Sequence, residues 1–140
     1  MKIIHRSVQI VLALCFALIT SCGGGADSHE KLMGDMLSLM DKTTAILKNA
    51  KDKASAEKAK GELQALVGDF EKLGERSKKL GKPDAALDKT LKEKNAAKLE
   101  ATMGGFMVEG MRVQMNPELK KIVNDPMESI GKTMKSLDSN

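Results

Sequence analysis

The feature that most constrains the fold of this chain is a long apolar seam within residues 55–80. Seven positions recur there at alternating steps of four and three: Ala59, Leu63, Leu66, Phe70, Leu73, Ser77 and Leu80. This spacing places every member on one face of an α-helix and is typical of contact faces in antiparallel bundles and coiled coils. The chain must therefore supply further helices that cover this face.

Three more segments show helical periodicity of their apolar residues. They cover residues 28–48, 83–115 and 117–138. Short polar or glycine- and proline-containing stretches separate all four segments. Within the last segment, Asp125 and Pro126 predict a kink or a split into two short helices. The sequence thus predicts an all-α, up-down helical bundle of three to four helices, with three if the last segment docks only in part.

Composition agrees with long amphipathic helices in a single domain. The chain has 140 residues, of which 30% are charged and 2% are aromatic, and it contains neither Trp nor Tyr. Strands favour aromatic and β-branched residues, so this composition argues against a β-sandwich. The length leaves room for one core.

Residues 1–21 have the three-part form of an export signal. Lys2 and Arg6 precede an apolar stretch, which runs from Val8 to Ile19 and is followed by small residues. A helix needs about 20 apolar residues to cross the hydrocarbon core of a membrane, and this stretch is shorter. The segment is therefore interpreted as a cleaved leader rather than a retained membrane span.

The end of this leader resembles the lipobox of bacterial lipoprotein precursors, in which an aliphatic residue and two small residues precede a modified cysteine. Ile19, Thr20, Ser21 and Cys22 match that pattern in order. The resemblance implies that the leader is cut before Cys22. Its sulfur would carry a diacylglycerol, and its new amino group can take a third acyl chain. An ordinary secretory signal cut near Ala26 is the alternative, and it would leave a soluble exported protein.

The same resemblance implies where the protein resides. Two or more acyl chains hold a protein firmly on a membrane, because each buried methylene contributes about 0.8 kcal/mol. Some Gram-negative families place Asp after the cysteine to retain lipoproteins at the inner membrane, whereas this chain has Gly23. The expected location is the outer membrane facing the periplasm in a Gram-negative cell, or the outer face of the cell membrane in a Gram-positive one. Residues 22–27 then form the acylated cysteine and a flexible glycine-rich tether, and residues 28–138 form the bundle.

The kind of charge that the chain carries argues against nucleic acid as a partner. It holds 23 basic and 19 acidic residues, and Lys2 and Arg6 belong to the leader, so the remainder is nearly balanced. Arginine, the residue best suited to bidentate phosphate recognition, occurs beyond the leader only as Arg76 and Arg112. Aromatic residues on which bases could stack are also scarce.

Residues that catalysis and metal binding require are few. Cys15 lies in the leader, so Cys22 has no disulfide partner, and an acylated sulfur is no thiolate ligand for zinc. His29 is the one histidine beyond the leader, which argues against a histidine-based catalytic triad. The sequence predicts no enzyme, no metal site and no cofactor apart from the lipid on Cys22.

Methionine is the unusual part of the composition, with 10 in the chain. Four recur at every fourth residue of the third segment: Met103, Met107, Met111 and Met115. Core filling is the simplest interpretation, because flexible thioethers fill a core that has few aromatic residues. Two alternatives remain open. One is a surface that adapts to varied partners or ligands, and the other is a site for a soft ion such as Cu(I) or Ag(I).

Glu109 lies within this apolar stretch. A buried carboxylate there would have a raised pKa and could act as acid, base or ligand. The simpler interpretation is an ion pair with Arg112, three residues further on. Ala97, Ala101 and Gly105 recur at four-residue spacing and predict close approach of a neighbouring helix. The candidate ligand or partner surface comprises Met103, Met107, Glu109, Met111 and Met115.

Together these features predict a non-enzymatic, lipid-anchored protein of the cell envelope whose bundle serves as a structural or protein-binding module. Its expected partners are the membrane, through the lipid, and another envelope protein. The alternative is a carrier of a soft metal ion or a small apolar ligand in a methionine-lined bundle interior.

Overall fold

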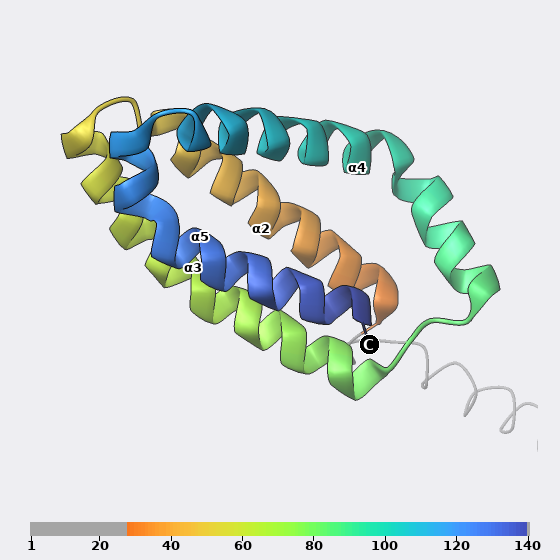
Figure 1. Ribbon diagram of the computed structural model, residues 1–140. Coiled ribbons are helices and arrows are strands. Elements are labelled where there is room, and N and C mark those ends of the chain that lie inside the picture. The colour runs from red at the N-terminus through yellow and green to blue at the C-terminus, as the bar shows by residue number, and fades with distance from the viewer. Residues whose placement is uncertain (1–27, 140) are drawn as a thin grey trace, which may run out of the picture.

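The computed structural model describes residues 28–139, which form four helices and no strand. In chain order these are α2 (His29–Asn49), α3 (Lys53–Leu80), α4 (Ala85–Gln114) and α5 (Pro117–Ser139). Consecutive helices run in opposite directions (Figure 1). The described part of the chain is therefore the predicted all-α, up-down bundle, and it has four helices rather than three.

The leader and tether fall outside this part of the chain. Ile19, Thr20, Ser21 and Cys22, with the rest of segments 1–21 and 22–27, lie outside the described residues. Within residues 28–139, each helix is too short or too polar to span a bilayer.

The apolar seam of α3 forms the centre of the core, as its spacing predicts. Its members are buried except Leu80, which is half-buried. Helices α2 and α5 supply most of the facing side chains, among them Leu37, Leu47, Leu119, Val123 and Ile130. Helix α4 supplies much less, since its buried residues are Leu91, Thr102 and Val113. The core is thus built mainly by three helices, and α4 covers it from one side.

Neighbours in the bundle do not follow chain order. Helix α2 packs against α3 and α4, and α5 packs against α3 and, over a smaller area, α4. The pairs α3/α4 and α2/α5 make no backbone contact, so each pair lies diagonally across the bundle. In Figure 1, the C-terminal part of α4 lies close to α2, and the N-terminal part of α4 diverges from α2 toward the loop at residues 81–84.

Side-chain caps fix where the first two helices begin. The Ser28 hydroxyl accepts a hydrogen bond from the backbone N–H of Lys31, so α2 begins at the residue after Ser28. Asp52 and Ser55 form a reciprocal capping box, in which each side chain accepts from the backbone of the other. This box starts α3 two residues before the predicted position at residue 55.

The connection between α3 and α4 is set by glycine and aspartate. Gly81 has φ of 70°, a left-handed conformation that favours glycine, and it ends α3 as the sequence predicts. Asp84 caps α4 by accepting from the backbone N–H of Leu87 at 2.8 Å. Pro83 therefore precedes the helix and does not occupy its first turn.

Helix α5 is continuous through Pro126, so of the two predicted outcomes the split into two short helices is wrong and the kink remains. Proline has no N–H to donate to the carbonyl four residues back, which weakens the helix at that point. Buried Val123 and Ile130 lie on either side of Pro126 and hold both halves of the helix in the core. Figure 1 shows α5 changing direction after its first turns.

Candidate functional site

The methionines singled out in the sequence lie on the outside of the bundle. Met107 is 56% exposed, Met111 is 61% exposed and Met115 is 83% exposed. Core filling is therefore the wrong interpretation for these three. Met103 is 45% exposed and also lines a cavity between the helices.

Other residues of α4 face α2. The buried hydroxyl of Thr102 donates a hydrogen bond of 2.8 Å to a carboxylate oxygen of Asp41. At Gly105, a Cβ atom would lie 3.4 Å from the methyl of Thr44, so the two helices approach closely there. At 3.6 residues per turn, Thr102 and Met111 lie on opposite sides of α4. The prediction of close approach is thus right for Gly105.

No helix of the same chain approaches Ala97 and Ala101, because both are exposed. They belong instead to a second regular face of α4, which we name the outer α4 stripe: Ala97, Ala101, Gly104, Val108, Met111 and Met115. Its members recur at steps of four, three, four, three and four, and all are exposed. The four-residue spacing of the methionines does not reveal this face. The alternating steps of four and three that define it are nevertheless present in the sequence.

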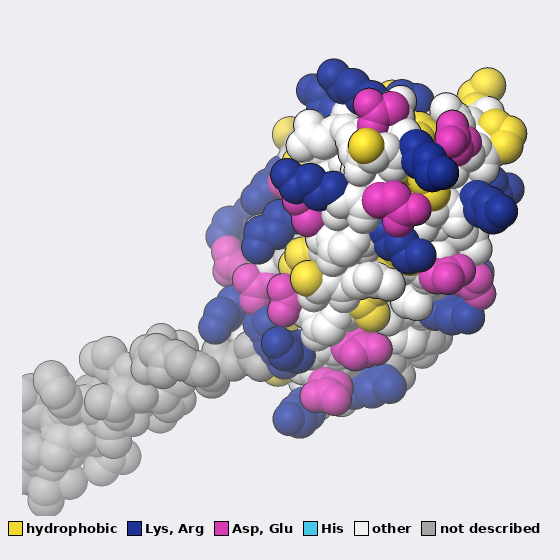
Figure 2. Space-filling view, turned by 90° about the vertical axis from the view of Figure 1, so that its left-hand side faces the viewer, with side chains coloured by type: hydrophobic (Ala, Val, Ile, Leu, Met, Phe, Trp, Pro, Cys, Tyr) yellow, Lys and Arg dark blue, Asp and Glu magenta, His cyan; other side chains and the backbone are white. Residues whose placement is uncertain are grey.

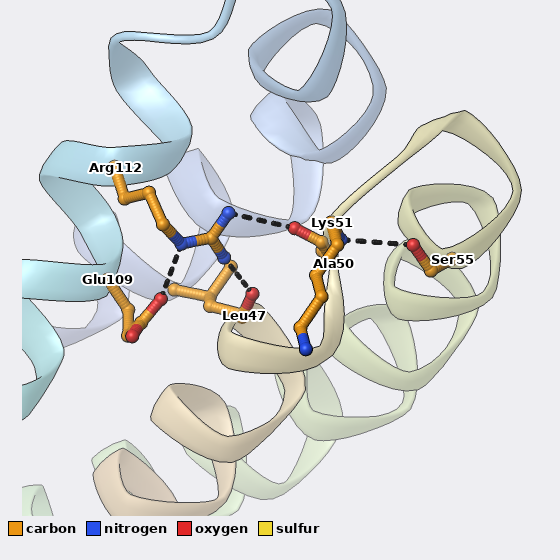
Figure 3. Close-up of polar contacts among 6 residues, drawn as sticks. All are labelled: Leu47, Ala50, Lys51, Ser55, Glu109 and Arg112. Atoms are coloured by element: carbon orange, nitrogen blue, oxygen red, sulfur yellow. Dashed lines mark hydrogen bonds and ion pairs between the residues drawn. The ribbon is translucent and has the colours of Figure 1, made fainter.

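Glu109 and Arg112 form the ion pair that their spacing predicts (Figure 3). The Arg112 Nε atom lies 2.7 Å from a carboxylate oxygen of Glu109, whose side chain is 17% exposed. The guanidinium also donates to the carbonyl of Ala50 at 2.9 Å and to the carbonyl of Leu47. Carbonyls at a helix C-terminus lack helical partners and attract cations, so Arg112 fastens α4 to the end of α2.

A cavity of about 670 Å³ opens between the N-terminal half of α4 and the other three helices. Ligand pockets in proteins commonly measure about 300–1,000 Å³. Most of the lining is apolar, and five methionines contribute to it: Met33, Met36, Met40, Met103 and Met134. Of these, Met103 alone belongs to the surface predicted from the sequence, because the cavity draws on helices that are distant along the chain.

Polar side chains gather at one end of this cavity. His29 at the start of α2 and Lys82 in the loop at 81–84 line it, together with Asp88 and Lys92 of α4. Lys92 Nζ lies 2.7 Å from a carboxylate oxygen of Asp88, so these two charges offset each other. The balance of charge at this end is therefore positive.

Ionisable groups elsewhere serve local structure. The hydrogen bonds from Ser55, first from its hydroxyl and then from its backbone, lower the pKa of Asp52. The hydrogen bond and charge of Lys132 lower the pKa of Glu128. Within residues 28–139, no three His, Cys, Asp or Glu side chains come together as a metal site would require.

Charge is evenly mixed on the end of the bundle that carries the α2–α3 and α4–α5 connections. Figure 2 shows basic and acidic side chains interspersed over this face, with small hydrophobic areas between them and protruding hydrophobic side chains at the upper right, at the level of α4. The described chain is thus a four-helix bundle with one apolar stripe on the outside of α4 and one apolar cavity beneath it. Comparisons with protein-family models, with curated proteins and with solved structures find no match to the chain.

Proposed function

We propose that this protein is a non-enzymatic, lipid-anchored protein of the cell envelope whose bundle docks a partner helix on the outer α4 stripe. The observation that carries the proposal is the stripe, in which apolar and small residues are exposed at coiled-coil spacing and no described helix covers them. Lipid anchoring rests on the match of Ile19 to Cys22 with a lipobox.

The partner that best fits the outer α4 stripe is a second copy of α4 packed antiparallel to the first. Three layers result, in which Ala97 faces Met115 of the partner subunit, Ala101 faces Met111 of the partner subunit and Gly104 faces Val108 of the partner subunit. Every layer pairs a small residue with a larger one, which fills space without overpacking. A two-fold axis repeats each pair, as in symmetric dimers. Parallel packing would set large residues against large ones and Gly104 against itself.

Residues that flank the outer α4 stripe are compatible with this arrangement. On one flank, Glu100 would face Gln114 of the partner subunit, and Met107 would face Met107 of the partner subunit, so no two acids oppose each other. On the other flank, Lys98 would face Arg112 of the partner subunit, whose charge is already offset by Glu109 in the same chain. Flanking charges of this kind govern the choice of partner in coiled coils.

Cysteine cross-linking of the full-length chain in membranes tests the pairing. The double variant Ala101→Cys, Met111→Cys should form a disulfide-linked dimer on mild oxidation, because these positions meet in one layer. Either single variant should cross-link poorly, since its two cysteines would lie about 15 Å apart along the helices. Efficient cross-linking of both single variants would indicate parallel packing and contradict the proposal.

A charge placed within the outer α4 stripe provides the matched control. Val108→Glu, added to the double cysteine variant, should abolish the cross-link, whereas Lys98→Glu at an exposed flanking position should leave most of it. Absence of cross-linking in every variant, together with a monomeric mass for the wild-type protein, would exclude a second copy as the partner.

The anchor has a separate test. A clickable palmitate analogue should label the wild-type protein, and Cys22→Ala should lose the label, because Cys22 is the proposed acylated residue. Unchanged labelling of Cys22→Ala would overturn the lipoprotein assignment without affecting the docking proposal.

A second candidate function, a carrier of a small apolar ligand, is favoured by the cavity of about 670 Å³ and its apolar lining. The soft-metal form of this candidate would use the thioethers of the lining. Titration with Cu(I) tests it. Binding that is equal in the wild-type protein and a Met36→Leu, Met103→Leu variant would contradict a methionine site.

A further inference from the structure

We infer that the cavity between the N-terminal half of α4 and the other helices binds one long-chain fatty acid, with the acyl chain in the apolar interior and the carboxylate beside Lys82. This inference deepens the second candidate function and does not depend on the outer α4 stripe. The cavity and the stripe occupy different faces of α4, so each can be changed without the other.

The interior of the cavity suits an acyl chain. Its apolar lining comes from all four helices and includes Leu32, Met36, Leu73, Leu99 and Leu137. Thioether side chains are unbranched and flexible, so they adapt to a chain that has many conformations. Its volume of about 670 Å³ lies within the range of pockets that hold small ligands.

The charge at one end suits a carboxylate. Asp88 is paired with Lys92 at 2.7 Å, which leaves Lys82 as the uncompensated charge of the described lining. Lys82 is exposed, so its ammonium group can remain hydrated while it attracts an anion. His29 adds hydrogen-bonding capacity at the same end. A neutral apolar ligand would not use these groups.

The charged end of the cavity is also the end nearest the proposed anchor. His29 begins α2, one residue beyond the segment 22–27 that would tether the bundle to the membrane. Six extended residues span at most about 20 Å, so the opening would lie close to the lipid surface. A membrane is the natural store of long-chain fatty acids, and this placement would favour their entry.

Entry requires little disruption of the bundle. Near the cavity, α4 is fastened to α2 by an ion pair in which Lys94 Nζ lies 2.5 Å from a Glu30 oxygen. Both side chains are more than 60% exposed, and such pairs contribute little stability. Leu91 is the one buried side chain in residues 85–95, so we expect the N-terminal half of α4 to move aside while Thr102 and Arg112 hold the remainder in place.

Photolabelling of the full-length protein in isolated membranes tests this inference. The probe is a fatty acid that carries a diazirine and an alkyne, added shortly before irradiation. We expect a labelled wild-type protein with adducts on cavity residues. Leu99→Trp, which fills the cavity, should reduce the label at least tenfold, whereas Met107→Trp on the exposed side of α4 should retain it. Equal labelling of the two variants, or adducts confined to the outer α4 stripe, would overturn the inference.

Competition on the wild-type protein gives a second readout that needs no cavity variant to fold. At equal free concentrations in water, unlabelled fatty acids should compete about fourfold better for each added methylene until the cavity is full. A fatty alcohol of the same length should compete less well than the acid, and Lys82→Glu should remove that difference. Equal competition by acid and alcohol would contradict the role of Lys82.

Two further variants separate this inference from the other proposals. Val108→Glu, which blocks the proposed dimer, should label as the wild-type protein does, so failure of docking and failure of ligand binding are distinguishable. Cys22→Ala, compared in the same lipid environment, tests whether the protein's own acyl anchor fills the cavity. A large rise in labelling of Cys22→Ala would identify the anchor as the occupant and contradict binding of a free fatty acid.

Discussion

Arg112 shows which part of a side chain's role is local and which is tertiary. Its ion pair with Glu109 follows from three-residue spacing on one helix, and the sequence predicts it. Its hydrogen bonds to the carbonyls of Leu47 and Ala50 join residues more than 60 positions apart. No local sequence pattern predicts that contact, because the contact depends on how α4 lies across the end of α2.

Replacing Arg112 should therefore destabilise the bundle. Arg112→Ala should lower the free energy of unfolding by about 1–2 kcal/mol, because hydrogen bonds to a charged donor are lost and two carbonyls lose a partner. Arg112→Lys should recover only part of this, since an ammonium group cannot reproduce the planar fork of donors. Urea denaturation measures the free energy of unfolding of both variants. As a control, Lys98→Ala at an exposed position should have a free energy of unfolding within about 0.5 kcal/mol of that of the wild-type protein. Similar losses for Arg112→Ala and Lys98→Ala would contradict the fastening role.

Asp52 makes a pH-dependent contribution at the start of α3. The hydrogen bonds from Ser55 lower its pKa from the usual 3.8 in the folded state. Its contribution is therefore fully present above the unfolded pKa and is lost as the pH falls from about 3.8 through the lower folded value. Asp52→Asn should keep the cap, because Asn also accepts the backbone hydrogen bond. Urea denaturation across about pH 5 to pH 2 should show a shallower loss of stability in Asp52→Asn, and an unchanged slope would contradict this account.

At the scale of whole helices, periodicity predicts α3 better than α4. The seam of α3 has one apolar face, and that face is buried. Residues 101–115 are apolar on several sides, so periodicity does not say which side faces the bundle. The structure turns Thr102 and Gly105 inward and Met111 and Met115 outward. The predicted methionine surface is exposed, and its role in binding stays a prediction.

A glycine inside α3 and the glycine that follows this helix should respond in opposite ways to the same substitution. Gly68 lies inside α3 with no atom within 4 Å of an added Cβ, so Gly68→Ala should stabilise the protein by up to about 1 kcal/mol through helix propensity. Gly81 has φ of 70° and ψ of −171°, a region that is essentially restricted to glycine, so Gly81→Ala should destabilise the protein by about 1–3 kcal/mol. Thermal unfolding monitored by circular dichroism measures both changes. A stable Gly81→Ala protein would mean that the α3–α4 connection adapts to a right-handed conformation.

For the whole molecule, the sequence predicts three to four helices and their antiparallel order, but not which helices are neighbours. Short connections require only that consecutive helices run antiparallel. They do not determine that α3 and α4 lie diagonally opposite each other, which depends on the faces that pack best. The cavity follows from this arrangement, because α4 diverges from α2 toward the loop at residues 81–84 and side chains of all four helices line the space between them. A site formed in this way cannot be predicted from local sequence patterns.

This arrangement should divide the molecule into regions of different local stability. Residues 85–95 have one buried side chain, Leu91, and the exposed Lys94–Glu30 pair, whereas residues 102–113 are fastened by Thr102 and Arg112. Backbone amides at 85–95 should therefore exchange with deuterium much faster than those at 102–113, and the buried seam of α3 should exchange slowest. Raised salt should speed exchange at 85–95 only slightly, because it screens an exposed ion pair that contributes little stability. A fatty acid in the cavity should slow exchange in the same segment. If exchange is uniform along α4 and responds neither to salt nor to the fatty acid, the N-terminal half of α4 does not open independently.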